Sequence, residues 1–89
     1  MKHLNITIYG RVQGVGFRRA AKIQAQYLGI KGLAKNMSDG SVYIEAEGET
    51  AVLDEFVKWC RKGPAYAQVN DIHIMEDSFK NYTAFGAGY

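Results

Sequence analysis

Residues 10–19, GRVQGVGFRR, combine three glycines with three arginines, a composition suited to binding an anion. Gly14 and Gly16 lack the Cβ that would keep a ligand away from the backbone, and both can adopt a positive φ. A tight loop of this kind turns successive N–H groups inward. If a helix begins near Phe17, its first N–H groups point to the same place, and Arg18 adds a planar fork that matches phosphate oxygens. The segment therefore predicts a phosphate-sized anion site.

A plain strand-to-helix turn with solvent-exposed arginines would also account for these residues. Two well-known types of phosphate-binding loop are excluded. A Walker A loop needs Gly-Lys followed by Ser or Thr, which does not occur in this chain. The dinucleotide fingerprint GxGxxG fails because Arg19 stands where its third glycine is needed. Arg19 and Lys22 could enrich the positive field around the loop, but we favour the alternative that they simply lie on an exposed helical surface.

Charge is distributed unevenly along the 89 residues, although the net charge is only +2. Residues 1–38 contain seven Lys or Arg and no acid, whereas residues 39–89 contain all nine acids and four bases. A local anion site in the first half fits this pattern, and the near-neutral total favours a small anion over a long polyanion.

The elements that must position the loop follow from hydrophobic periodicity and turn residues. We expect strands at residues 4–9, 30–37, 41–47 and 68–75, and a short or irregular strand within residues 80–89. Helices are expected at residues 17–28, before Gly29, and from an N-cap at Thr50 to Gly63-Pro64, with a turn at residues 38–40. This βαββαβ order with a trailing strand predicts one α+β domain over residues 1–89, a ferredoxin-like split βαβ sandwich with two helices on one face of an antiparallel sheet.

Side-chain patterns predict which residues face inward. The apolar face of the first helix is expected to be broad, and Ile72 and Ile74 are expected to point inward. Cys60 is expected to be a buried small hydrophobe, and Trp59 to be packed and partly buried. His3 and His73 are predicted to be surface residues of the sheet. The residues of the first helical face are Phe17, Ala20, Ala21, Ile23, Tyr27 and Leu28.

Asn36 is a second candidate for chemistry, near the end of the second strand. It lies in phase with Gly32 and Ala34. Its uncharged amide both donates and accepts, so it could hold a water on one side and an oxygen on the other. A turn-flanking asparagine that caps the hairpin is the alternative interpretation.

Two segments, GRVQGVGFR at residues 10–18 and GLAKNMSDGSVYIEAEG at residues 32–48, resemble the two signature segments of the acylphosphatase family. The resemblance extends over nearly the whole chain, including Gly63-Pro64. Leu33, Tyr43 and residues 82–89 depart from the family pattern, and the last of these departures concerns the packing of the final strand.

The resemblance implies hydrolysis of the carboxyl-phosphate anhydride of acyl phosphates to a carboxylate and inorganic phosphate, with no metal or cofactor. It implies that Arg18 binds phosphate and that Asn36 positions the attacking water. No motif points to a side-chain nucleophile, so we expect water to attack phosphorus directly. The residues implied to form the phosphate-binding loop are Gln13, Gly14, Val15, Gly16, Phe17 and Arg18.

Two rival functions remain open. An RNA-binding module shares the element order, and Tyr9 and Tyr43 could stack bases, but Glu45 and Glu47 share the face of Tyr43 and would repel phosphates. A catalytically silent acyl-phosphate-binding or interaction domain is the other rival. We expect a monomer in the cytoplasm, with a small acyl phosphate as substrate and inorganic phosphate as product and competitive inhibitor. Neither nucleic acid nor membrane is an expected partner.

Overall fold

The computed structural model describes residues 1–87 and contains the two helices and five strands that the periodicity predicts. The element order matches the prediction, and most bounds differ from it by one or two residues. The strands are β1 (Lys2–Arg11), β2 (Lys31–Asn36), β3 (Val42–Gly48), β4 (Gln68–Asp77) and β5 (Phe85–Ala87), and the helices are α1 (Phe17–Leu28) and α2 (Thr50–Lys62).

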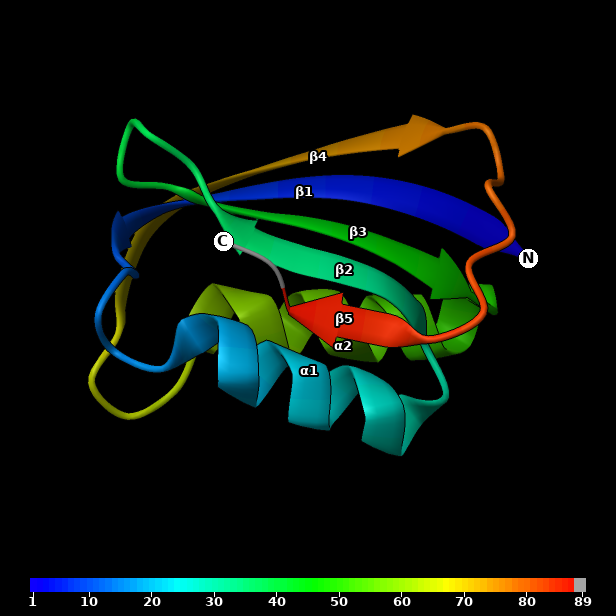
Figure 1. Ribbon diagram of the computed structural model, residues 1–89, viewed down its shortest axis with the longest axis horizontal. Coiled ribbons are helices and arrows are strands. Elements are labelled where there is room, and N and C mark those ends of the chain that lie inside the picture. The colour runs from blue at the N-terminus through cyan, green and yellow to red at the C-terminus, as the bar shows by residue number, and fades with distance from the viewer. Residues whose placement is uncertain (88–89) are drawn as a thin grey trace.

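Both helices lie on one face of a five-stranded sheet whose strand order is β4-β1-β3-β2-β5 (Figure 1). β1 pairs antiparallel with β3 and β4, and β2 pairs antiparallel with β3. The β1–α1 loop and the β2–β3 hairpin therefore lie at the same end of the sheet, although β3 separates β1 from β2 (Figure 1). This arrangement brings the two predicted functional segments together.

The predicted all-antiparallel sheet is wrong at its last strand. β5 pairs parallel with β2, with Gly32 opposite Phe85 and Ala34 opposite Ala87, so the sheet is mixed. After β4 the chain crosses the end of the sheet to reach the far edge (orange to red in Figure 1). Phe85 is buried and packs edge-on against Phe56 of α2, at 6.2 Å between ring centroids.

The buried face of α1 is narrower than predicted. Phe17, Ala21 and Ala25 are buried at a spacing of four residues, whereas Ile23 is 59% exposed and Tyr27 is 84% exposed. In β2, Gly32 and Ala34 are buried. Small residues at facing positions let a helix approach a sheet closely, and a stripe this narrow leaves the flanks of the helix in solvent.

The second helix ends as predicted but begins without the predicted cap. Thr50 is its first residue, the N-cap position belongs to Glu49, and no side chain caps the helix there. Gly63 ends the helix with φ 71°, and a Cβ at this position would lie 2.8 Å from the ring of Phe17. Cys60 is fully buried, as predicted. Trp59 packs edge-on against Phe17 at 5.4 Å between ring centroids.

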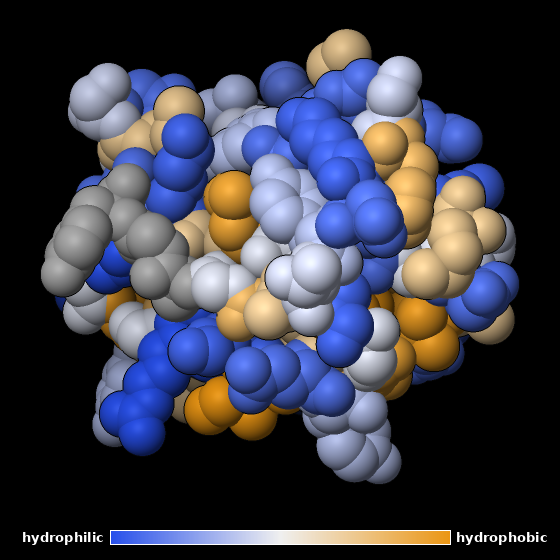
Figure 2. All heavy atoms as spheres, turned by 45° about the vertical axis from the view of Figure 1, so that its right-hand side comes forward, coloured by the Kyte–Doolittle hydropathy of each residue, from blue (hydrophilic) through white to orange (hydrophobic). Residues whose placement is uncertain are grey.

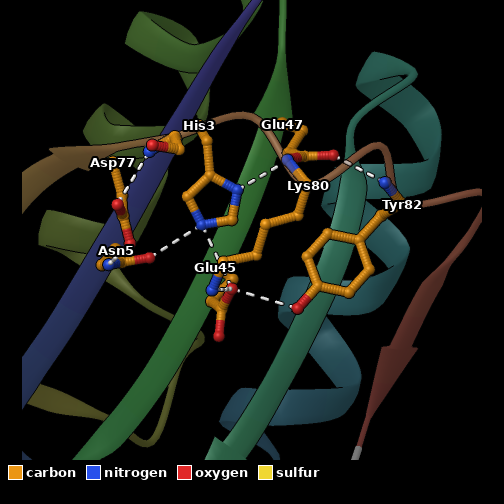
Figure 3. Close-up of polar contacts among 8 residues, drawn as sticks. His3, Asn5, Glu45, Glu47, Asp77, Lys80 and Tyr82 are labelled. Atoms are coloured by element: carbon orange, nitrogen blue, oxygen red, sulfur yellow. Dashed lines mark hydrogen bonds and ion pairs between the residues drawn. The ribbon is translucent and has the colours of Figure 1, made fainter.

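His3 is fully buried, which corrects its predicted surface position, whereas His73 is exposed as predicted. The residues after β4 fold over the open face of the sheet and cover His3, and the ring of Tyr82 stacks at 6.1 Å from it (Figure 3). Ile72 is half-buried and Ile74 is 36% exposed because β4 is the edge strand. The sequence pattern of β1 does not show that a later segment covers it.

On the side shown in Figure 2, polar and apolar residues are interspersed, and apolar groups gather toward its right-hand edge. Within residues 1–87, no helix is long and apolar enough to cross a membrane.

Candidate active site

A cavity of about 140 Å³ opens where the β1–α1 loop meets the end of β2. Five of the seven predicted site residues line it, namely Gly14, Gly16, Phe17, Arg18 and Asn36. The remaining lining residues are Val12 and Arg19. The structure therefore brings the glycine loop, the arginine that follows it and the asparagine of β2 to one small hollow.

The backbone of the loop has the conformation that the glycines were predicted to permit. Gly14 has φ 74° and Gly16 has φ 77°, both in the left-handed region that disfavours other residues. Neither position is crowded, since a Cβ on either residue would meet nothing within 4 Å. The glycines are thus needed for their dihedral angles, which let the loop curl around the cavity.

The N-terminus of α1 opens into the same hollow. Gly16 is its N-cap residue, and its carbonyl accepts the first helical bond, from Ala20 N–H at 3.0 Å. Within residues 1–87, no side chain caps this helix end and no acid lies in its first turn. The first N–H groups of a helix have no acceptor within the helix, so an anion in the cavity would meet these donors and the positive end of the dipole.

Asn36 reaches the cavity from β2. It is the last residue of the strand, pairs with Val42 and shares the helix-facing side of the sheet with the buried Gly32 and Ala34. The phase predicted from the sequence is therefore confirmed. Within residues 1–87, its amide has no hydrogen-bond partner, so its position follows from the backbone at the end of β2.

Two of the residues implied by the family resemblance do not line the cavity. Val15 is half-buried and packs against the core. Gln13 directs its amide nitrogen to the β2–β3 hairpin, where it donates to Met37 O at 2.8 Å and to Ser41 O at 2.9 Å. Some residues of the loop therefore line the cavity, and others hold the loop in place.

Arg19 is not among the predicted site residues, because the exposed helical surface is the favoured interpretation over a contribution to the field of the loop. Arg19 is exposed, and it also borders the hollow beside Arg18. Its place in the first turn of a helix that begins at the loop is the signal that could have indicated this. Among the described residues, no acid lines the cavity, so both guanidinium groups give it a positive character.

The acylphosphatase family model matches residues 4–86, a span that includes both elements of the cavity. An acylphosphatase from Ligilactobacillus salivarius is 43% identical over 91 residues, and the match covers all of both chains. The crystal structure of an acylphosphatase from Bacillus subtilis is 37% identical, covers all of both chains and superposes with a TM-score of 0.97.

A third similarity is to one segment of a larger protein. The structure of full-length HypF in its phosphate- and nucleotide-bound form is 30% identical and has a TM-score of 0.89, over 99% of this chain but 12% of that chain. The complete matches to separate acylphosphatases and the family model agree with one another. The chain therefore belongs to the acylphosphatase family and is an acylphosphatase enzyme.

Proposed function

We propose that this enzyme binds the phosphate of a small acyl phosphate in the cavity and that water held by Asn36 attacks the phosphorus. The observation that carries the proposal is that the glycine loop, Arg18 and Asn36 border one hollow of about 140 Å³. A phosphate seated against the loop would thus have the Asn36 amide beside it.

Backbone N–H groups of residues 14–18 and the guanidinium of Arg18 bind the phosphate oxygens. The positive φ of Gly14 and Gly16 and the uncapped N-terminus of α1 support this role. Charge builds up on these oxygens as the reaction proceeds, and fixed donors stabilise it without having to reorganise. The side chains of Gln13 and Val15 do not border the cavity, so they stabilise the loop and do not contact the phosphate.

Asn36 orients the water whose oxygen forms the new bond to phosphorus. The bond between phosphorus and the acyl oxygen breaks, the carboxylate leaves with that electron pair, and inorganic phosphate remains in the loop. The carboxylate is a good leaving group, so positioning and charge stabilisation matter more than a strong base. The water proton passes to a phosphate oxygen or to solvent.

The reaction takes place without a metal ion or cofactor. The positive charge that a metal would supply comes from Arg18, from the field of Arg19 and from the helix N-terminus, all of which border the cavity. The cytoplasmic location and the monomeric state stay predictions from the sequence, and size-exclusion chromatography with light scattering checks the monomer.

The disappearance of benzoyl phosphate in the presence of EDTA tests the proposed function. The purified protein should hydrolyse it rapidly, and kcat of Asn36→Ala should fall by about 10²-fold because the reacting water loses its orienting group. The affinity for inorganic phosphate, measured as competitive inhibition, should change little, because the loop and Arg18 remain.

Two outcomes would contradict this function. The first is a folded wild-type protein that binds inorganic phosphate but does not hydrolyse benzoyl phosphate. The chain would then be a catalytically silent phosphate-binding domain. This is the second candidate function, and the similarity to one segment of the larger protein HypF is the observation that favours it. Equal losses of phosphate affinity and kcat in Asn36→Ala would assign Asn36 a structural role instead.

A further inference from the structure

The side chain of Gln13 connects the phosphate loop directly to the hairpin that follows Asn36. Its Nε2 donates to Met37 O at 2.8 Å and to Ser41 O at 2.9 Å. An amide nitrogen has two hydrogens, so these two bonds use every donor of the side chain. Gln13 is therefore committed to the hairpin and has no donor left for a phosphate oxygen.

The two carbonyl groups that Gln13 contacts close the β2–β3 turn. Met37 N–H donates to Ser41 O at 2.9 Å, and Gly40 N–H donates to Met37 O at 3.1 Å. Each carbonyl oxygen thus accepts one bond from the turn and one from Gln13. The amide joins the loop to the hairpin at the point where β2 ends.

A second set of hydrogen bonds, made within the hairpin itself, also stabilises this turn. The Asp39 carboxylate accepts hydrogen bonds from the hydroxyl of Ser41 at 2.5 Å and from its backbone N–H at 2.9 Å. These bonds hold the pKa of Asp39 below its usual value. Asp39 stabilises the turn without contacting the phosphate loop, so it provides a matched control for Gln13.

The sheet alone does not fix the distance between the loop and Asn36. The loop follows β1, Asn36 ends β2, and β3 lies between these two strands. Asn36 precedes Met37 in the chain, and its side-chain amide has no hydrogen-bond partner within residues 1–87. Gln13 is consequently a direct hydrogen-bonded link between the loop that would hold phosphate and the hairpin that follows Asn36.

We infer that Gln13 is a positioning residue, which sets the distance between a phosphate in the loop and the water on Asn36. The inference rests on the proposed function. A misplacement of about 1 Å between reacting groups costs on the order of 10²-fold in rate, so a link of this kind affects kcat without touching the substrate.

Gln13→Met tests this inference, because methionine has a similar length and no hydrogen-bond donor. We expect kcat for benzoyl phosphate to fall about 10-fold, since the distance between the reacting groups is no longer fixed. Inhibition by inorganic phosphate should stay within about two-fold, because the loop N–H groups and Arg18 remain. Gln13→Asn keeps the amide but shortens its reach, and it serves for the same comparison if the methionine variant does not fold.

The matched control is Asp39→Ala, which removes the other brace of the turn. It should lower the free energy of unfolding, measured by urea denaturation, while kcat stays within about two-fold of wild type. If Asp39→Ala lost as much kcat as Gln13→Met, hairpin stability alone would explain the Gln13 effect and the inference would be wrong.

A double variant asks whether Gln13 acts through Asn36. Gln13→Met combined with Asn36→Ala should have the kcat of Asn36→Ala alone, because the distance no longer matters once the water holder is gone. The inference would be overturned if the double variant lost kcat by the product of the two separate factors. It would also be overturned if Gln13→Met weakened inhibition by inorganic phosphate. A wild type that does not hydrolyse benzoyl phosphate would instead refute the proposed function on which it rests.

Discussion

β1 has a polar region at each end, and the two regions are built in opposite ways. After its carboxyl end, the cavity has two bordering arginines, no acid in its lining within residues 1–87 and an uncapped helix N-terminus. Near its amino end, His3 is fully buried among acceptors, with Nδ1 2.7 Å from Glu47 Oε2 and Nε2 2.8 Å from Asn5 Oδ1 (Figure 3).

The His3 cluster, which we define as His3, Asn5, Glu45, Glu47, Asp77, Lys80 and Tyr82, is held together by hydrogen bonds among its own members (Figure 3). Glu47 accepts from the backbone N–H groups of Lys80 and Tyr82, and Glu45 accepts from Lys80 Nζ at 2.9 Å and from the Tyr82 hydroxyl at 3.0 Å. Within residues 1–87, no buried side-chain polar atom lacks a partner.

The two ends of β1 are suited to different tasks, stability at the amino end and binding at the carboxyl end. The His3 cluster satisfies its polar groups internally and fixes the segment after β4 to the sheet. The cavity is bordered by two arginines and a helix N-terminus, and under the proposed function it binds an anion from solution. Variants at the two ends of β1 should therefore change different quantities.

The largest effect is expected at Arg18. Arg18→Ala should lower kcat/KM for benzoyl phosphate about 10³-fold and weaken inhibition by inorganic phosphate, because it removes a bidentate, charged donor at the phosphate. Arg19→Ala, at the adjacent and more exposed arginine, is the control and should lose less than about 10-fold through the weaker field alone. Steady-state kinetics with phosphate as inhibitor measures both. If inorganic phosphate inhibited Arg18→Ala almost as strongly as the wild type, Arg18 would not be a phosphate-binding residue.

The next effect concerns the other end of β1 and appears in stability. His3→Ala should lower the free energy of unfolding by about 3 kcal/mol, because it leaves Glu47 buried without its side-chain partner. His73→Ala is the matched control, since that ring also lies 3.1 Å from a carboxylate, that of Asp71, but is 63% exposed. It should change stability by less than about 0.5 kcal/mol. Urea denaturation measures both, and a large loss of kcat in folded His3→Ala would break the separation of the two regions.

The smallest effect is a dependence of stability on pH. Burial acts to raise the pKa of Glu45 and Glu47, but hydrogen bonds from Lys80, Tyr82 and His3 outweigh it, and each pKa lies below the ordinary 4.5. A lowered pKa in the folded state means that the stability is fully present well above pH 4.5 and is lost as the pH falls through the lowered values.

Urea denaturation between pH 7 and pH 3 measures this dependence. The free energy of unfolding should fall in the acid range, and Glu47→Gln should make that part of the profile less steep by removing one of the carboxyl groups whose pKa is lowered in the folded state. An identical acid slope in the wild type and the variant would show that Glu47 does not contribute.

Much of the candidate site could be predicted because it depends on local signals. Glycines that need a positive φ, an arginine in the first turn of a helix and an asparagine in phase with small residues are each visible within a few positions of the chain. The order of the elements follows from periodicity in the same way.

The features that could not be predicted depend on distant contacts. His3 and Glu47 are 44 positions apart, and they become buried only when residues 78–82 cross the sheet. Gln13 finds its acceptors 24 and 28 positions away, so its sequence neighbours give no sign of its role. The parallel pairing of β5 likewise depends on where the chain goes after β4, which no local pattern of three residues determines.

A titration of ¹⁵N-labelled protein with inorganic phosphate, followed by NMR, tests directly whether the loop binds phosphate. We expect the amide signals of Gly14, Gly16, Phe17 and Arg18 to shift together, while those of His3 and Glu47 do not move. Shifts confined to other surfaces, or an unchanged loop at phosphate concentrations that inhibit hydrolysis, would contradict this expectation.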